Sequence, residues 1–262
     1  MVNRTNTVTG VKYSEDPTIF SWNILNEPRF FYNYSKCHDD PQFCRNKLYS
    51  WIKETSSHLK SIDSNHLVSI GYEGFFAPSS QYSKANPSGG WVKYTGQDFE
   101  NDTALSTIDY AEIHLWVDNW DVAGNNGFIK TWIKDHEKAA QKLGKPLVME
   151  EFGKNTTNPF NEQIKDQQVR NQTFSTVMSY LTDSLNSGGI LRGALYWMWD
   201  PIIQSTNSPG YNKFGQDQVP VNGSTFQNII VPAADKAASK NSTVQSCSNN
   251  STSSAGRKML WV

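Results

Sequence analysis

Short apolar, β-favouring runs recur along this chain and are separated by segments of helical periodicity. The first run covers residues 18–25, and Pro28 must follow the end of that strand because proline has no N–H for a sheet. Apolar runs of the same kind predict four further strands, at 67–72, 108–116, 147–151 and 191–199.

Helical periodicity fills three of the intervening segments. Apolar side chains spaced three to four residues apart predict helices over 46–62, 128–143 and 161–185. Residues 3–14 are interpreted as the end of a further helix. The remaining segment, 76–107, is predicted to be a long loop, in which Trp91 and Tyr94 either line a cleft or merely anchor the loop.

Alternation of strands and helices predicts an α/β fold with a parallel sheet and right-handed crossovers. Five such units fit strands four to eight of a (β/α)8 TIM barrel. An open, doubly wound sheet is the alternative, but its usual Gly-rich phosphate loop is absent after the first strand. We therefore expect residues 1–232 to form an incomplete barrel domain, and the Ser/Asn/Thr-rich residues 233–262 to form a tail or linker.

Two of the predicted strands end in glutamates, in Asn26-Glu27-Pro28 and in Glu150-Glu151. Barrel enzymes keep their catalytic side chains at the carboxyl ends of the strands. Two carboxyl groups suit glycoside hydrolysis, in which one protonates the leaving oxygen and the other attacks the sugar. Neighbouring strand residues face opposite sides, so only Glu150 or Glu151 can face the barrel axis. The structural alternatives are a helix-start carboxylate for Glu27 and a salt-bridged strand end for Glu151.

Composition limits the class of partner. The formal net charge is −1, which gives no indication of a nucleic-acid or anionic-membrane partner, and no apolar run approaches the ~20 residues that span a bilayer. Nine tryptophans contribute to an aromatic content of 13%. Aromatic rings stack on sugars, although a Trp-rich core is an equally good explanation.

Sequons and cysteines point to a secretory pathway. Asn-x-Ser/Thr occurs at Asn3, Asn33, Asn101, Asn155, Asn171, Asn222, Asn241, Asn249 and Asn250. In an oxidising compartment, Cys37 and Cys44 should form a local disulfide; a zinc site would need partners that the nearby sequence lacks. Cys247 has no evident mate. Residues 1–5 carry no export signal, so we expect an N-terminal portion to be missing.

From about Arg4 to Trp199 the sequence resembles the family 5 glycoside hydrolases, in particular the eukaryotic-type endo-β-1,4-mannanases. In that family the Asn-Glu-Pro glutamate, matched by Glu27, is the acid/base. The glutamate before an aromatic-Gly pair, matched by Glu151, is the nucleophile. The resemblance implies a retaining reaction on mannan, glucomannan or galactomannan, with carboxyl groups roughly 5–5.5 Å apart. It implies no metal or organic cofactor.

The resemblance also suggests which residues contact the polysaccharide. It implies that Asn26 binds the 2-hydroxyl, that His114 orients the two glutamates and that Trp197 floors the cleaved sugar. Trp116 stands where the family more often has a tyrosine that hydrogen-bonds the nucleophile. The complete substrate-binding set is Asn26, Arg29, Glu73, His114, Trp116, Trp120 and Trp197. A structural histidine at 114 and simple core packing of Trp197 are the alternatives.

Strands one to three of the barrel have no counterpart in this resemblance, so three functional hypotheses stay open. The first is a secreted endo-β-mannanase, monomeric if its barrel is complete. The second is a family 5 enzyme that cleaves another β-1,4-glycan. The third is a non-catalytic carbohydrate-binding fragment.

Overall fold

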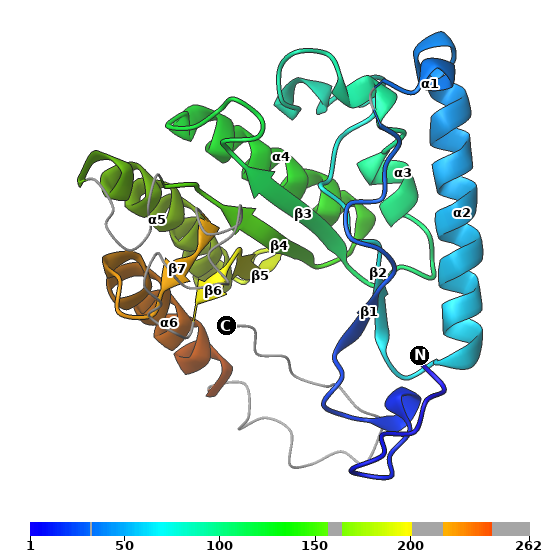
Figure 1. Ribbon diagram of the computed structural model, residues 1–262, viewed down its shortest axis with the longest axis horizontal. Coiled ribbons are helices and arrows are strands. Elements are labelled where there is room, and N and C mark those ends of the chain that lie inside the picture. Colours follow the sequence, from blue (N-terminus) through cyan, green and yellow to red (C-terminus); the bar gives the residue numbers. More distant parts are fainter. Residues whose placement is uncertain (32, 157–163, 201–216, 243–262) are drawn as a thin grey trace, which may run out of the picture. The chain divides into compact units, whose positions relative to one another are not determined.

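The computed structural model describes residues 1–31, 33–156, 164–200 and 217–242, and Figure 1 labels its helices and strands. The chain divides into two compact units. The first unit comprises Met1–His114 and Lys134–Val148, and the second comprises Leu115–Ile133 and Met149–Val262.

In the first unit, β1 (Ser21–Asn23) and β2 (Leu67–Ser69) pair in parallel. Helices α1 (Ser35–Asp39) and α2 (Pro41–Ile62) connect them along the chain. A parallel pair requires a crossover of this kind, so the predicted strand–helix–strand order is confirmed here. Both strands are shorter than predicted.

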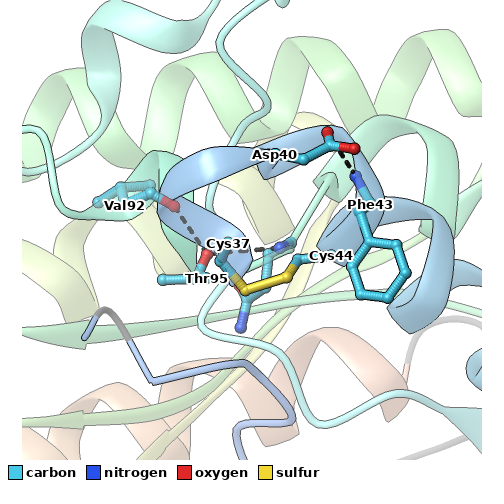
Figure 2. The surroundings of a disulfide bond; sticks show 7 residues. Cys37, Asp40, Phe43, Cys44, Val92 and Thr95 are labelled. Carbon is cyan, nitrogen blue, oxygen red and sulfur yellow. Dashed lines mark hydrogen bonds between the residues drawn. A yellow bond between two sulfur atoms is a disulfide. The ribbon is translucent and has the colours of Figure 1, made fainter. Parts of the chain in front are cut away.

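Helix α2 begins before the predicted residue 46. The Asp40 side chain accepts a hydrogen bond from the Phe43 N–H at 3.0 Å, and Pro41 occupies the first turn, where no N–H is needed. The predicted disulfide is confirmed: Cys37 of α1 is bonded to Cys44 of α2, with their Cα atoms 5.6 Å apart (Figure 2). The bond ties the short helix to the long one.

The predicted loop 76–107 contains local structure. It includes helix α3 (Phe99–Thr103) and two short 3-10 helices, Ser83–Ala85 and Val92–Tyr94. The Lys145 ammonium group fixes the end of this segment by donating to the main-chain carbonyls of Thr103, Leu105 and Ile108. Burial lowers the pKa of Lys145, although the negative charge of Asp109 opposes this effect.

The predicted single sheet is instead three sheets in the described part of the chain: β1-β2, β3-β4-β5 and β6-β7. Side chains interrupt the pairing between β2 and β3 (Ala111–Trp116). The Asp109 carboxylate accepts from the Val68 N–H at 2.6 Å, and the Glu112 carboxylate accepts from the N–H groups of Gly71 and Tyr72. These carboxylates take donors that a continuous ladder would have used.

The second unit contains most of β4 (Leu147–Gly153) and all of β5 (Leu191–Tyr196). Helix α4 (Asn126–Leu143) follows β3 in sequence, and α5 (Ile164–Ser187) follows β4, close to the predicted ranges. The Phe152 ring packs on Phe174 of α5 at 4.8 Å between centroids. Strand β4 is thus held against α5 by aromatic packing.

The predicted strand 191–199 is divided in two. Strand β5 ends at Tyr196, and β6 (Trp199–Asp200) pairs in parallel with β7 (Val219–Pro220). Helix α6 (Val231–Ser242) then packs against α5, so the predicted tail at 233–262 begins inside a helix. Residues 243–262, which include Cys247, lie outside the described residues, and the tail boundary stays a prediction. None of the helices in the described ranges is long and apolar enough to cross a membrane.

The interpretation of residues 3–14 as a helix end is wrong. Thr5 and Lys12 form an antiparallel bridge, and a 3-10 helix follows at Tyr13–Glu15. The Asn6 side chain accepts from two N–H groups of the turn, those of Val8 and Thr9. Asparagine favours such local turns over a helix.

Candidate active site

Glu27 lies in a strained turn just after β1. Its N–H donates to the Gly71 carbonyl at 2.7 Å. Its φ is +47°, a left-handed conformation that is uncommon for residues other than glycine and disfavoured before proline. Gly71 is required opposite, because a Cβ there would lie 1.9 Å from the Leu25 carbonyl oxygen. Such outliers persist where their surroundings enforce them, and they cluster at functional sites.

The Glu27 carboxylate contacts a buried histidine of β3. His114 Nδ1 lies 2.9 Å from Glu27 Oε1; the histidine side chain is 1% exposed and the glutamate side chain 24%. An ionised carboxylate can only accept, so when Glu27 is ionised the proton of this hydrogen bond belongs to Nδ1. The main-chain N–H of His114 donates to the Glu73 carbonyl at 3.1 Å. The structure therefore brings Glu27, His114 and Glu73 together, and their roles in catalysis stay predictions.

Glu73 is a buried carboxyl group beside Arg29. The guanidinium Nη1 of Arg29 lies 2.6 Å from Glu73 Oε1. Burial, followed by the negative charge of Glu27, raises the pKa of Glu73 to about 7, against the opposing effect of Arg29. The charge on Glu73 is therefore sensitive to pH near neutrality.

Two residues of the long segment complete these surroundings. The buried Gln97 donates through Nε2 to the Glu73 carboxylate and to the Pro28 carbonyl, the latter at 3.3 Å. The guanidinium carbon of Arg29 lies 5.9 Å from the centre of a Trp91 ring. Trp91 was a candidate from its place in the loop, whereas nothing in the sequence distinguishes Gln97.

Glu151 lies near the end of β4 in the second unit. The indole Nε1–H of Trp116 donates to Glu151 Oε1 at 2.6 Å. The tryptophan therefore supplies a hydrogen bond from a position where the family more often has tyrosine. Glu150 and Glu151 are both partly exposed, so burial does not distinguish them, and the choice of Glu151 as the functional glutamate stays a prediction.

Close packing explains the glycine of the Phe152-Gly153 pair that follows Glu151. A Cβ on Gly153 would lie 2.6 Å from the Trp116 ring and 2.9 Å from the Trp197 carbonyl oxygen. The Trp197 N–H donates to the Phe152 carbonyl at 2.8 Å, while its side chain is 40% exposed. Trp197 is thus anchored through its backbone and presents its ring to solvent, as stacking on a sugar requires.

An acidic pair near Glu151 was not predicted. Burial, together with the negative charges of Asp118 and Glu151, raises the pKa of Asp217 to about 6. Asp118 is ion-paired with Lys154 at 2.8 Å and accepts from the Asn155 N–H at 2.7 Å. Asp118 could have been identified from its position just after β3. Asp217 is distant from Asp118 and Glu151 in sequence, so no pattern in the sequence pointed to it.

Two further predicted residues differ in exposure. Asn26, next to Glu27, is exposed. Trp120 is buried, with its ring 5.2 Å from that of Trp132 and 6.3 Å from that of Phe128. Trp120 therefore belongs to an aromatic cluster, and its contact with substrate stays a prediction.

Sequence comparison identifies relatives over most of the chain. The profile of a family described as GH family 5 beta-mannosidase-like matches residues 1–222. Mannan endo-1,4-beta-mannosidases 1 and 3 of Arabidopsis thaliana are both 36% identical to this chain. The alignments cover 82% and 90% of this chain but 51% and 54% of the relatives. The chain thus spans about half the length of the curated relatives it matches.

Comparison with solved structures identifies the same class of enzyme as the sequence comparison. The endo-1,4-beta-mannanase of Rhizomucor miehei is 30% identical, with a TM-score of 0.70 over 91% of this chain and 58% of that one. The endo-beta-1,4-mannanase of Thermotoga petrophila is 29% identical, with a TM-score of 0.68 over 92% of this chain and 48% of that one. The predicted fold class is confirmed: the described strands and helices are part of a (β/α)8 barrel.

Proposed function

The chain belongs to the GH family 5 beta-mannosidase-like family, and from this premise we propose that it acts as a retaining endo-β-1,4-mannanase. Its substrates are internal β-1,4-mannosidic bonds of mannan, glucomannan or galactomannan. The substrate class is supported by its Arabidopsis thaliana relatives, which are named as mannan endo-1,4-beta-mannosidases. The observation that carries the proposal is the strained Glu27 of Asn26-Glu27-Pro28, held against buried His114.

Glu27 is the proposed general acid and then the general base. It protonates the leaving glycosidic oxygen, and later takes a proton from the water that attacks the intermediate. The hydrogen bond from His114 Nδ1 orients the carboxyl group without closing it off from solvent. Proton exchange with both sugar and water requires this partial exposure.

Glu151 is the proposed nucleophile. It attacks the anomeric carbon and forms a covalent glycosyl-enzyme, which water then hydrolyses with Glu27 acting as base. The 2.6 Å hydrogen bond from the Trp116 indole holds the attacking carboxylate in place. The indole N–H is a donor only, so it can hold the carboxylate but takes no part in proton transfer.

Exposure supports two of the proposed substrate contacts, those of Asn26 and Trp197. Exposed Asn26 is placed beside the acid to bind the 2-hydroxyl of the sugar, and the exposed Trp197 ring stacks on a sugar face. The partly exposed Arg29 offers charged donors to a neighbouring sugar unit, and its partner Glu73, which is buried, belongs to the proposed set together with it. His114, Trp116 and Trp120 complete the proposed set.

The proposed setting is extracellular. Nine sequons and the Cys37–Cys44 disulfide support a secreted glycoprotein. We further propose a monomer that needs no metal or organic cofactor and binds neither nucleic acid nor membrane.

The test is release of reducing ends from linear β-mannan by the 262-residue chain made in a secretory host. Cellulose and the Glu151→Gln variant run alongside. Cleavage of mannan that the substitution abolishes is the expected result. Faster cleavage of cellulose than of mannan would mean that the substrate is another β-1,4-glycan. Soluble protein that binds mannan without cleaving it would mean that the chain has only a carbohydrate-binding role.

A further inference from the structure

Gln97 is a buried amide with three directed hydrogen bonds. Its side chain is 3% exposed, and its Oε1 accepts from the Phe75 N–H at 3.2 Å. Its Nε2 donates to the Glu73 carboxylate and to the Pro28 carbonyl. Buried amides are costly unless they are paired, so a fully used glutamine at this place has a definite orientation.

These hydrogen bonds join the two segments that surround the proposed acid. Pro28 directly follows Glu27 in its strained turn, and Glu73 is the ionic partner of Arg29. We propose that Gln97 is a positioning residue, which holds the Glu73 carboxylate against Arg29 and fixes the turn that carries Glu27. This inference deepens the proposed function and depends on it for the roles of Glu27 and Arg29.

The backbone beside Gln97 is itself fixed. The Phe30 N–H donates to the Thr95 carbonyl at 2.8 Å. A Cβ on Gly96 would lie 3.0 Å from the Phe30 ring and 3.1 Å from the Cys44 carbonyl oxygen. Figure 2 shows Thr95 in the surroundings of the Cys37–Cys44 disulfide. Gln97 therefore follows a stretch of backbone that is hydrogen-bonded and closely packed, as a positioning role requires.

Gln97 also affects the charge balance at Glu73. Arg29, His114 and the Gln97 amide favour the ionised carboxyl group, whereas burial and the Glu27 charge favour the protonated one. Removing the amide raises the pKa of Glu73 further. Arg29 would then lose its ionic partner over a wider range of pH.

The test compares two loop amides in the 262-residue chain. Gln97→Met keeps the side-chain length and removes the donors. Asn86→Leu is the matched control, because Asn86 holds the same long segment by two hydrogen bonds to the Phe76 backbone, at 2.9 and 2.8 Å. Both variants lose an amide of the loop, but only the first loses the bonds to Glu73 and Pro28.

Kinetics on mannohexaose distinguish positioning from loop support. Gln97→Met is expected to raise KM about tenfold, as for the loss of a hydrogen bond to a charged group. KM should fall as pH rises, because Glu73 must ionise to pair with Arg29. In Gln97→Met this fall in KM should occur at a higher pH than in the unsubstituted chain. Asn86→Leu should leave both features unchanged. Equal effects of the two substitutions would overturn the proposal and reduce Gln97 to a loop support.

Titration of the Glu73 carboxyl group tests the role of Gln97 without any need for enzymatic activity. Carbon-13 NMR of labelled glutamate carboxyls, assigned with Glu73→Gln, should show a higher pKa for Glu73 in Gln97→Met than in the unsubstituted chain. An unchanged titration would overturn the proposal. If the unsubstituted chain does not cleave mannan, the proposed function fails while this titration still decides the role of Gln97.

Discussion

The two proposed catalytic glutamates have surroundings of different kinds. Glu27 lies in a left-handed turn, and buried polar side chains, His114 and Gln97 among them, bond to it or to its neighbours. Glu151 lies in a regular strand, and its described hydrogen bond comes from the Trp116 indole. The first carboxyl group is positioned by a network that reaches its backbone. The second is carried by a regular strand and accepts a hydrogen bond from a neutral donor.

The difference matches the proposed division of labour. An acid that later becomes a base must reach both the leaving oxygen and the attacking water. Its carboxyl group must therefore keep its position whether it is protonated or ionised. A nucleophile needs only to stay ionised and aligned. Substitutions that weaken one region at a time test this difference, beginning with those of the largest expected effect.

Replacing each glutamate by glutamine should separate the two roles. Glu151→Gln should lower turnover by on the order of 10⁴-fold on mannan and on an aryl β-mannoside, because both reactions need the nucleophile. Glu27→Gln should lose about 10²–10⁴-fold on mannan. It should lose much less in the first, glycosylation step of the aryl substrate, whose leaving group needs no proton. Equal burst-phase losses in the two variants would contradict the assignment.

Removing the disulfide should destabilise the first unit. The double variant Cys37→Ser/Cys44→Ser opens a short loop, and chain entropy predicts a loss of about 2–3 kcal/mol in the free energy of unfolding. Urea unfolding of the variant measures this loss, with Cys247→Ser as the control. A loss no greater than that of the control would show that α1 is held without the bond.

Removing the indole donor should weaken catalysis without unfolding the second unit. Trp116→Phe should lower kcat about tenfold, as for the loss of a hydrogen bond to a carboxylate. Trp132→Phe, a buried tryptophan of α4, controls for lost aromatic packing. Kinetics on mannohexaose give the comparison, and a kcat equal to that of the control would mean that the donor is dispensable.

The buried acids of the first unit should make stability fall as pH rises. Burial raises the pKa of Asp102 to about 7, so the unfolded chain, with an ordinary aspartate, loses this proton first. Stability due to the protonated group is present at low pH and is lost between about pH 4 and pH 7. Between pH 5 and pH 7, Asp102→Asn should reduce this loss by about 2 kcal/mol, while its oxygen still accepts from the Tyr72 hydroxyl.

Urea unfolding at pH 5 and pH 7 measures the effect of Asp102→Asn. An unchanged difference between the two pH values would contradict it. Because the pKa of Glu73 is also raised, Glu73→Gln should change the difference in the same direction.

Periodicity predicted much of the secondary structure because burial governs those residues. Helix α4 and strand β4 appear close to their predicted ranges, and α2 ends at the predicted Ile62. The missed start of α2 reflects capping by Asp40 and Pro41, a local signal that apolar spacing does not contain. The interrupted ladder between β2 and β3 depends on the carboxylates of Asp109 and Glu112, whose partners lie about 40 residues away.

The site was predictable where chemistry lies in short motifs. Glu27 and Glu151 were proposed from their strand-end positions and neighbours, and the structure shows a hydrogen bond to each of them, with His114 and with Trp116. Gln97 and Asp217 were missed because each acquires its importance from residues distant in sequence. The positive φ of Glu27 was missed because proline usually imposes an extended conformation on the residue before it.

The central claim is that Glu151 forms the covalent intermediate while Glu27 exchanges protons. The direct test is to incubate the protein with a 2-deoxy-2-fluoro-β-mannosyl fluoride, digest it and locate the label by mass spectrometry. The account predicts one 2-fluoromannosyl group on Glu151, and no label in Glu151→Gln. A label on Glu27 or Glu150, or turnover of mannan with inverted configuration, would contradict it.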